Sequence, residues 1–208
     1  MTDIVLIRAF DQPIGADYLD AAAAALEWCR ELYGVTPQLH FLAPDGLRCA
    51  CIFAAPDAEA VRNVIRAGKR GEPEALWACT IHPAADDDGS GDPGDATRAL
   101  ILVERTFEQP VAFDDLLAVG ARNFACFDLH GVRHARSYFS TDRRRMICLY
   151  QAPDAEAVRQ ANRAAGLPFE RAWPARVLVP TLAHDPEKAC PGLDPGCEAV
   201  SRLREALA

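Results

Sequence analysis

The amino-acid sequence predicts an α+β fold made of two tandem repeats, each with the element order β-α-β-β-α-β. Internal similarity is the first observation: residues 55–62 and 152–159 are identical, and the alignment runs without a gap between residues 6–67 and 103–164. About 25 of about 62 aligned positions agree, far more than chance gives, which indicates a duplication. The second observation is a hairpin signal in each copy, and the third is an Asp/Gly-rich segment between the copies.

Each repeat begins with a strand that ends at a Gln-Pro pair, because proline cannot continue a hydrogen-bonded ladder. A helix is expected next, with an aspartate in its first turn and a glycine just beyond its end. These elements are expected at residues 4–10 and 17–33 of the first repeat, and at residues 100–107 and 114–130 of the second.

Two strands joined by a tight turn follow, and then a second helix that Asp57 or Asp154 caps at its N-terminus. A final strand completes each repeat. The expected ranges are 35–42, 47–54 and 77–81 for the strands of the first repeat, and 132–140, 145–151 and 173–179 for those of the second. This order of elements is typical of a ferredoxin-like fold, an antiparallel sheet with two helices on one face.

The other face of each sheet is also expected to be covered. Residues 49–53 and 146–150 are apolar in both alternating sets, whereas a strand with one solvated face alternates apolar and polar residues. We expect the sister repeat to provide the cover, so that the chain forms an intramolecular pseudo-dimer resembling a dimeric α/β barrel. The expected segments are a first, degenerate repeat (1–82), a flexible linker (83–98), a second repeat expected to be the functional half (99–180), and a Pro/Gly-rich tail with a short helix at 198–207 (181–208).

Composition limits the partners. The net charge is −8, which argues against nucleic acid or an anionic membrane as the main partner. The N-terminus lacks the pattern of a signal peptide, and no apolar run approaches the roughly 18 residues of a membrane span. We therefore expect a cytoplasmic protein with a small-molecule ligand or a metal ion as its partner, and association into a homo-oligomer is left open.

The chain has eight cysteines, which we expect to be reduced in the cytosol. Two of them, Cys190 and Cys197, lie in the Pro/Gly-rich tail near His184. They suit either a disulfide or half of a metal site, although their spacing matches no zinc motif.

The two copies differ most in polar residues at strand positions. The second copy has Glu104, His134, Arg136 and Tyr138 where the first has isoleucine, proline, leucine and phenylalanine. A repeat that served stability alone would have little reason to retain these groups. We interpret the second repeat as the functional half and the first as its scaffold.

Strict alternation places His134, Arg136 and Tyr138 on one face of their strand. In a ferredoxin-like sheet, Arg105 and Cys148 then converge with His134 or Arg136 on one surface, inside the barrel where that face looks inward. The candidate ligand-binding residues are Glu104, Arg105, His134, Arg136, Tyr138, Cys148 and Tyr150.

The chemistry of these groups suggests three roles. Guanidinium groups clamp carboxylate or phosphate, so Arg105 or Arg136 suits an anionic ligand. His134 suits a general base, or a metal ligand together with Cys148. The alternative is a satisfied polar network between the sheets, or side chains that face water at a sheet edge.

Several segments of the second repeat resemble a known family. These are Val-Glu-Arg-Thr-Phe at 103–107, Arg-Ser-Tyr at 136–138, Cys-Leu-Tyr-Gln-Ala-Pro at 148–153 and Ala-Gly-Leu-Pro at 165–168. They are similar to the DUF4242 family of small ferredoxin-like bacterial proteins, which includes a nickel-binding member. The resemblance covers most of the second repeat and, more weakly, the first.

The resemblance implies nickel as the cofactor to consider. The positions that match the histidines of the nickel-binding member are Arg105, Arg133, Arg136, Asn162 and Leu167, and none of them is histidine. Guanidinium groups repel a metal cation, and only His134 and Cys148 offer donors nearby. The cofactor is therefore unknown from the sequence.

Two functions of different classes follow. The first is a non-catalytic protein that binds a small anion or a transition metal in the second repeat. The second is a cofactor-independent enzyme of the dimeric α/β-barrel type, a monooxygenase or isomerase, with His134 as its base and Arg105 or Arg136 orienting an anionic substrate. A third hypothesis is an interaction module without a small-molecule site. The chain contains no phosphate-binding loop, nucleophile elbow or metalloprotease motif.

Overall fold

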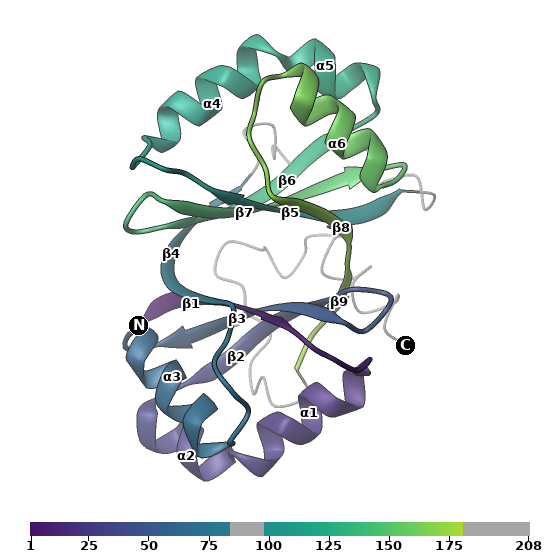
Figure 1. Ribbon diagram of the computed structural model, residues 1–208. Helices are drawn as coiled ribbons and strands as arrows, with labels where there is room; N and C mark the ends of the chain where they lie inside the picture. The colour runs from purple at the N-terminus through teal and green to yellow at the C-terminus, as the bar shows by residue number, and fades with distance from the viewer. Residues whose placement is uncertain (84–97, 181–208) are drawn as a thin grey trace, which may run out of the picture. The chain divides into compact units, whose positions relative to one another are not determined.

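The computed structural model describes residues 1–83 and 98–180 (Figure 1). The chain divides into two compact units: unit 1 comprises Met1–Ala78 and the segment that begins at Arg176, and unit 2 comprises Cys79–Ala175. Both are α+β, with antiparallel strand pairs and the helices of each unit on one face of its sheet (Figure 1). The expected fold class is thereby confirmed.

Unit 1 carries the elements of the first repeat. In chain order they are β1 (Thr2–Ala9), α1 (Ala16–Ala25), α2 (Glu27–Tyr33), β2 (Thr36–Leu42), β3 (Arg48–Ala55), α3 (Ala58–Ala67), the first part of β4 (Ala75–Pro83) and β9 (Arg176–Leu178). The strand order is β4-β1-β3-β2-β9, with β1 and β2 each antiparallel to β3. A βαββαβ chain with its third strand between the first and second is ferredoxin-like.

Unit 2 repeats this order. Its elements are the second part of β4, β5 (Ala99–Thr106), α4 (Phe113–Arg122), α5 (Phe124–Leu129), β6 (Arg133–Ser140), β7 (Arg145–Ala152), α6 (Ala155–Ala164) and β8 (Arg171–Pro174). The strand order is β8-β5-β7-β6-β4, again with the third strand of the repeat at the centre.

The final strand of each repeat differs from the prediction. The range 173–179 was expected to form one strand, but it forms β8, which pairs with β5, and β9, which pairs with β2 of unit 1. Likewise β4 continues beyond Ala78, and its residues Cys79–Pro83 pair with β6 of unit 2. The boundaries between the two units fall inside these segments, because each segment supplies a strand to both units.

The first helix of each repeat is also interrupted, so the expectation of one continuous helix is wrong. Leu26 separates α1 from α2 with φ −114° and ψ 18°, and Asn123 separates α4 from α5 with nearly the same angles. The Asn123 side chain donates to the carbonyl of Val119, a local bond that competes with regular helix geometry. Gly34 ends α2 in the left-handed conformation, as its position predicts.

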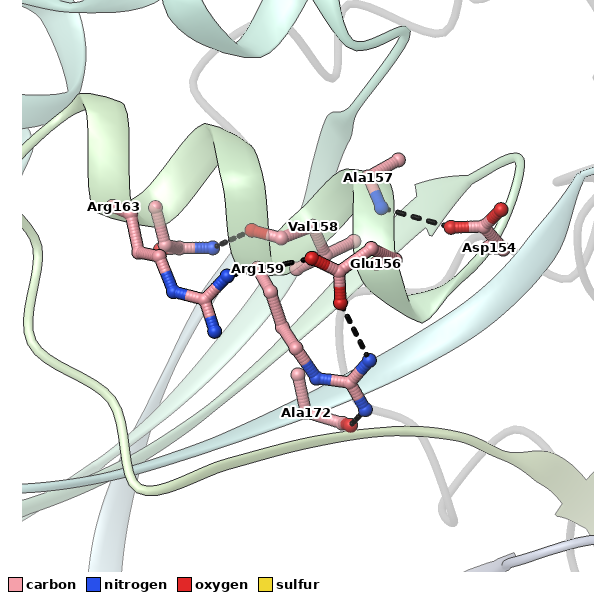
Figure 2. A network of polar contacts seen from close by, with 8 residues as sticks. Asp154, Glu156, Ala157, Val158, Arg159, Arg163 and Ala172 are labelled. Carbon is pink, nitrogen blue, oxygen red and sulfur yellow. Dashed lines mark hydrogen bonds and ion pairs between the residues drawn. The ribbon is translucent and has the colours of Figure 1, made fainter.

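The predicted caps of the second helices are confirmed. Asp57 accepts from the backbone N–H of Ala60 at 2.8 Å, and Asp154 accepts from that of Ala157 at 2.8 Å. Figure 2 shows how α6 is then fixed: Glu156 pairs with Arg159 and Arg163, and Arg159 also donates to the carbonyl of Ala172 in β8 at 2.7 Å. The two ion pairs lie within α6, and the hydrogen bond from Arg159 to Ala172 holds the helix against β8.

Each unit has its own apolar core between helices and sheet. The core of unit 1 includes Ile4, Leu6 and Val61, and the core of unit 2 includes Ile101, Val103 and Val158. All five residues Met146–Tyr150 of β7 are buried, so both alternating sets are covered, as expected. Packing of the two repeats sheet against sheet stays a prediction.

No helix in the two described ranges is long and apolar enough to cross a membrane. Three expectations lie outside the described residues: nearly all of the linker, the C-terminal helix at 198–207, and the group of His184, Cys190 and Cys197. Within residues 1–83 and 98–180, no cysteine is in a disulfide.

Candidate functional site

A buried arginine is the centre of the polar cluster in unit 2. Arg105 lies on β5 with only 3% of its surface exposed, on the face that packs against the helices. Its Nη2 donates to Asn162 Oδ1 on α6 at 2.5 Å and to the Tyr150 hydroxyl on β7 at 3.1 Å, and its Nη1 donates to the carbonyl of Pro168. Arg105 therefore joins the sheet to α6 and to the loop that follows it.

A charge in an apolar core is costly unless another charge offsets it. Burial favours the neutral form of Arg105, but Tyr150 and Cys148 outweigh it and raise the pKa of the guanidinium above its ordinary value. Its Nε is buried and has no hydrogen-bond partner among the described residues. The cluster thus contains a permanent cation that requires an anion beside it.

Cys148 provides that anion. The side chain lies on β7 with 2% exposure, and its Sγ accepts from Ser137 Oγ at 3.3 Å. Burial alone would raise the pKa of the thiol, but the Arg105 charge, His134 and Ser137 together lower it to about 6. Near neutral pH, Cys148 is therefore mainly a thiolate that neutralises Arg105.

His134 connects this thiolate to the half-buried end of β6. Its Nε2 lies 2.8 Å from Ser137 Oγ. The hydroxyl of Ser137 has one hydrogen, and it donates that hydrogen to Cys148, so it accepts from His134 Nε2–H. The resulting chain, His134 to Ser137 to Cys148, is a path for a proton between a partly accessible imidazole and a buried thiolate.

Tyr150 lies beside His134 in the same cluster. The phenol is buried, and its ring stacks on Phe127 and meets the His134 ring edge-on, with centroids 6.0 and 5.5 Å apart. Burial and the nearby Cys148 charge raise the pKa of Tyr150, so the phenol stays protonated. Tyr150 therefore serves as a neutral hydrogen-bonding group beside the Arg105–Cys148 pair.

The expectation that His134 and Arg136 share a face is wrong. The pairing of β6 with β7 shifts by one residue between them: His134 lies opposite Tyr150, while Arg136 lies opposite Leu149. The extra residue is Ala135, which forms a bulge, and a one-residue shift moves side chains to the other face of a sheet. His134 thereby joins Ser137 and Cys148 on the face that carries the helices.

The predicted residues therefore separate into two groups. Arg105, His134, Cys148 and Tyr150 come together beneath the helices, and not on a surface that looks away from them. Glu104, Arg136 and Tyr138 lie on the other face of the sheet, as their pairing with Ile147 and Leu149 requires. There, Glu104 accepts from the indole N–H of Trp173 at 2.7 Å.

Two members of the cluster were not among the predicted site residues. Asn162 holds Arg105 and also donates to the carbonyl of Val158 at 2.7 Å. Asn162 lies on the buried side of α6, where the first repeat has Ile65. A polar residue at a position that is apolar in the other copy could therefore have identified it as a site residue. Ser137 was hidden because strict alternation, without the bulge, assigns it to the wrong face.

Unit 1 lacks most of these groups. Pro37, Phe53 and Ile65 replace His134, Tyr150 and Asn162, and Arg8 donates to the carbonyls of Arg70 and Gly71 at 2.5 and 3.3 Å. The polar cluster is therefore confined to unit 2. Unit 1 keeps a different set of groups around His40, Cys49 and Cys51.

The donor set in unit 2 is small. Within residues 1–83 and 98–180, no group of three or more His, Cys, Asp or Glu side chains is arranged to hold a metal ion. His134 and Cys148 are the two donors that the cluster offers. Any metal bound there would complete its coordination with water or other groups.

Comparison with known proteins gives one family and several similar folds. The family described as nickel responsive protein SCO4226-like matches residues 102–174. No curated protein matches the chain. Among solved structures, chlorite dismutase from Candidatus Nitrospira defluvii in complex with imidazole is 10% identical with a TM-score of 0.47, covering 86% of this chain and 91% of that one. A putative monooxygenase from Fusobacterium nucleatum is 12% identical with a TM-score of 0.35, covering 86% and 92%.

Proposed function

We propose that this chain is a non-catalytic binding protein and that unit 2 binds a transition-metal ion through Cys148 and His134. The observation that carries the proposal is the chain of contacts from His134 through Ser137 to Cys148, 2.8 and 3.3 Å long. It places a thiolate and an imidazole, two groups that bind transition metals, on either side of the Ser137 hydroxyl, and Nε2 binds the ion once its proton has moved to Nδ1. The match to the nickel-responsive family, over residues 102–174, supports nickel as the first ion to test.

The chemistry of the donors sets what kind of site this is. Two protein ligands fit an open site, in which water fills the remaining positions, and not a closed structural site. The Arg105 guanidinium next to Cys148 opposes a second positive charge, so we expect weaker and more reversible binding than a closed site gives. Free thiols on both units fit a reducing compartment, and the proposal keeps the cytoplasm as its location.

A small anion is a poorer ligand for this cluster. The Nη groups of Arg105 already donate to Pro168, Asn162 and Tyr150, and Cys148 supplies the balancing negative charge. An external anion would have to displace the thiolate from the guanidinium. The arrangement therefore favours a cation at Cys148 over an anion at Arg105.

Nickel binding to protein purified without a tag tests the proposal. We expect one Ni²⁺ per chain by isothermal titration calorimetry, with a thiolate-to-nickel charge-transfer band in the near-ultraviolet. Cys148→Ser removes the band, and His134→Ala weakens binding at least about tenfold. Cys126→Ser and His130→Ala are matched controls, because both residues lie on or next to α5 and, within residues 98–180, neither forms a hydrogen bond or ion pair with the cluster.

Two results contradict the proposal. One is a wild-type protein that binds no Ni²⁺, and the other is binding that survives both Cys148→Ser and His134→Ala. In the second case the donors lie elsewhere in the chain, outside the cluster.

The cofactor-independent enzyme, expected with His134 as its base, remains the second candidate, because the partly accessible His134 is linked through Ser137 to a thiol, Cys148, whose pKa is lowered. A thiolate with a lowered pKa is a typical nucleophile. Its test is alkylation by iodoacetamide at neutral pH with peptide mass mapping. Faster modification of Cys148 than of half-buried Cys126 supports a reactive thiol, and protection of Cys148 argues against catalysis at this site.

A further inference from the structure

Unit 1 contains a pair of thiols that the second repeat does not have. Cys49 and Cys51 lie two residues apart on β3, so their side chains point to the same face, and their sulfur atoms are 3.8 Å apart. Both are buried in the core of unit 1 and neither is in a disulfide. At the equivalent positions the second repeat has Met146 and Cys148.

A histidine with an unused nitrogen lies next to this pair. His40 on β2 is directly opposite Cys51 in the sheet register. Its side chain is 5% exposed, and its Nδ1 has no hydrogen-bond partner among the described residues, which is unusual for a buried polar atom. Burial lowers the pKa of His40 to about 4 against the opposing charge of Asp20, so the ring adds no positive charge near neutral pH.

His40 also borders a cavity. The cavity has a volume of about 170 Å³ and is lined by residues of α1 and of the segment around β9, namely Ala16, Leu19, Asp20, Leu178 and Val179, together with His40 itself. His40 therefore lines this cavity and also lies opposite Cys51 in the sheet.

We propose that Cys49 and Cys51 bind one soft monovalent metal ion, Cu(I), in the core of unit 1. The two sulfur atoms are 3.8 Å apart, so one ion at an ordinary metal–sulfur distance of about 2.3 Å can contact both. Thiolates favour soft ions such as Cu(I) and Zn²⁺, and a structural Zn²⁺ site takes four ligands, so two sulfur donors suit Cu(I) better. No set of three donors converges among the described residues, so the site is defined by its two sulfur atoms.

Charge balance favours a monovalent ion. Arg8 lies opposite Cys49 in the register and donates to two backbone carbonyls, and it has no ion pair within the described residues. When Cu(I) binds both thiolates, two protons leave for the solvent and the buried pair gains one net negative charge, which the nearby Arg8 charge offsets. A divalent ion bound by both thiolates leaves the pair neutral, so it gives Arg8 no counter-charge. No electron is transferred in this exchange.

Competition for Cu(I) tests the inference. Reduced, untagged protein is titrated under anaerobic conditions with Cu(I) and bicinchoninate as the competing chelator. We expect the wild type to retain one Cu(I), with two sulfur neighbours in copper X-ray absorption. Cys51→Ser loses it, and Cys126→Ser, outside both sites, retains it.

Cys49→Met is a second test variant that should still fold, because the second repeat has a methionine, Met146, at the equivalent buried position. We expect this variant to keep its circular dichroism spectrum and to bind Cu(I) more than about tenfold more weakly, since a thioether carries no charge. A wild type that takes no Cu(I) from the chelator overturns the inference. So does Cu(I) retained by both Cys51→Ser and Cys49→Met. Ni²⁺ binding by the Cys148→Ser variant tests the proposed nickel site of unit 2 separately.

Discussion

Arg105 is the residue that decides the chemistry of unit 2. Its guanidinium takes three internal acceptors and one internal counter-charge, so the polar groups found in the second repeat form a connected network and not a set of independent side chains. Arg105, Cys148 and Tyr150 were predictable from their strand positions. Asn162 was predictable in principle from the difference between the copies, but Ser137 was not, because its face depends on a backbone bulge.

Asn162 gives a stability test at this scale. Asn162→Ala leaves the buried Arg105 without one of its acceptors, and an unsatisfied buried partner costs about 2–3 kcal/mol, more than a typical lost hydrogen bond. Gln160→Ala, on the exposed side of the same helix, is the control and should change the free energy of unfolding by less than about 0.5 kcal/mol. Urea denaturation measures both. Equal effects of the two substitutions would mean that Asn162 does not support Arg105.

Cys148 gives a pH test in metal-free protein. The folded-state pKa of about 6 lies below the roughly 8.5 of an unfolded thiol, so the thiolate stabilises the fold fully above about pH 8.5. This contribution is lost as the pH falls through about 6. The wild type should therefore become more stable relative to Cys148→Ser between pH 6 and pH 9. We expect the difference in their unfolding free energies to grow by about 3 kcal/mol, as the separation of the two pKa values implies. A difference that stays constant or shrinks over this range, relative to Cys126→Ser, contradicts an ionised Cys148.

At the scale of elements, local signals predicted the order and the caps well and the irregularities poorly. Gln-Pro, Asp57 and Asp154 mark ends and starts by chemistry that acts within a few residues. The breaks at Leu26 and Asn123 and the bulge at Ala135 each depend on one residue leaving a regular conformation. Such departures are set by packing against neighbouring elements, which a single periodic pattern does not reveal.

The turn between β2 and β3 allows a test of how tightly one secondary-structure element is packed. Gly46 has φ +70°, and a Cβ there would lie 2.5 Å from the carbonyl oxygen of Ile14. Gly71 has the same φ, but a Cβ there would meet nothing within 4 Å. Gly71→Ala should cost about 1 kcal/mol, because it adds only left-handed strain, and Gly46→Ala should cost at least about 2 kcal/mol more. Equal costs in thermal denaturation would show that the turn moves away from Ile14 easily.

At the scale of the whole molecule, two units with the same element order carry different soft donors. Unit 2 combines Cys148 with His134, while unit 1 combines Cys49 with Cys51 and has proline in place of His134. The repeat made this division visible from the sequence, since each copy serves as the reference for the other. The register of each sheet was needed to show which donors meet.

Nickel X-ray absorption on untagged protein tests the central claim, that unit 2 binds a transition metal through Cys148 and His134. We predict one sulfur neighbour and an imidazole nitrogen at the nickel ion, with the sulfur absent in Cys148→Ser. A shell of oxygen and nitrogen alone in the wild type, or a sulfur neighbour that persists in Cys148→Ser, would contradict it.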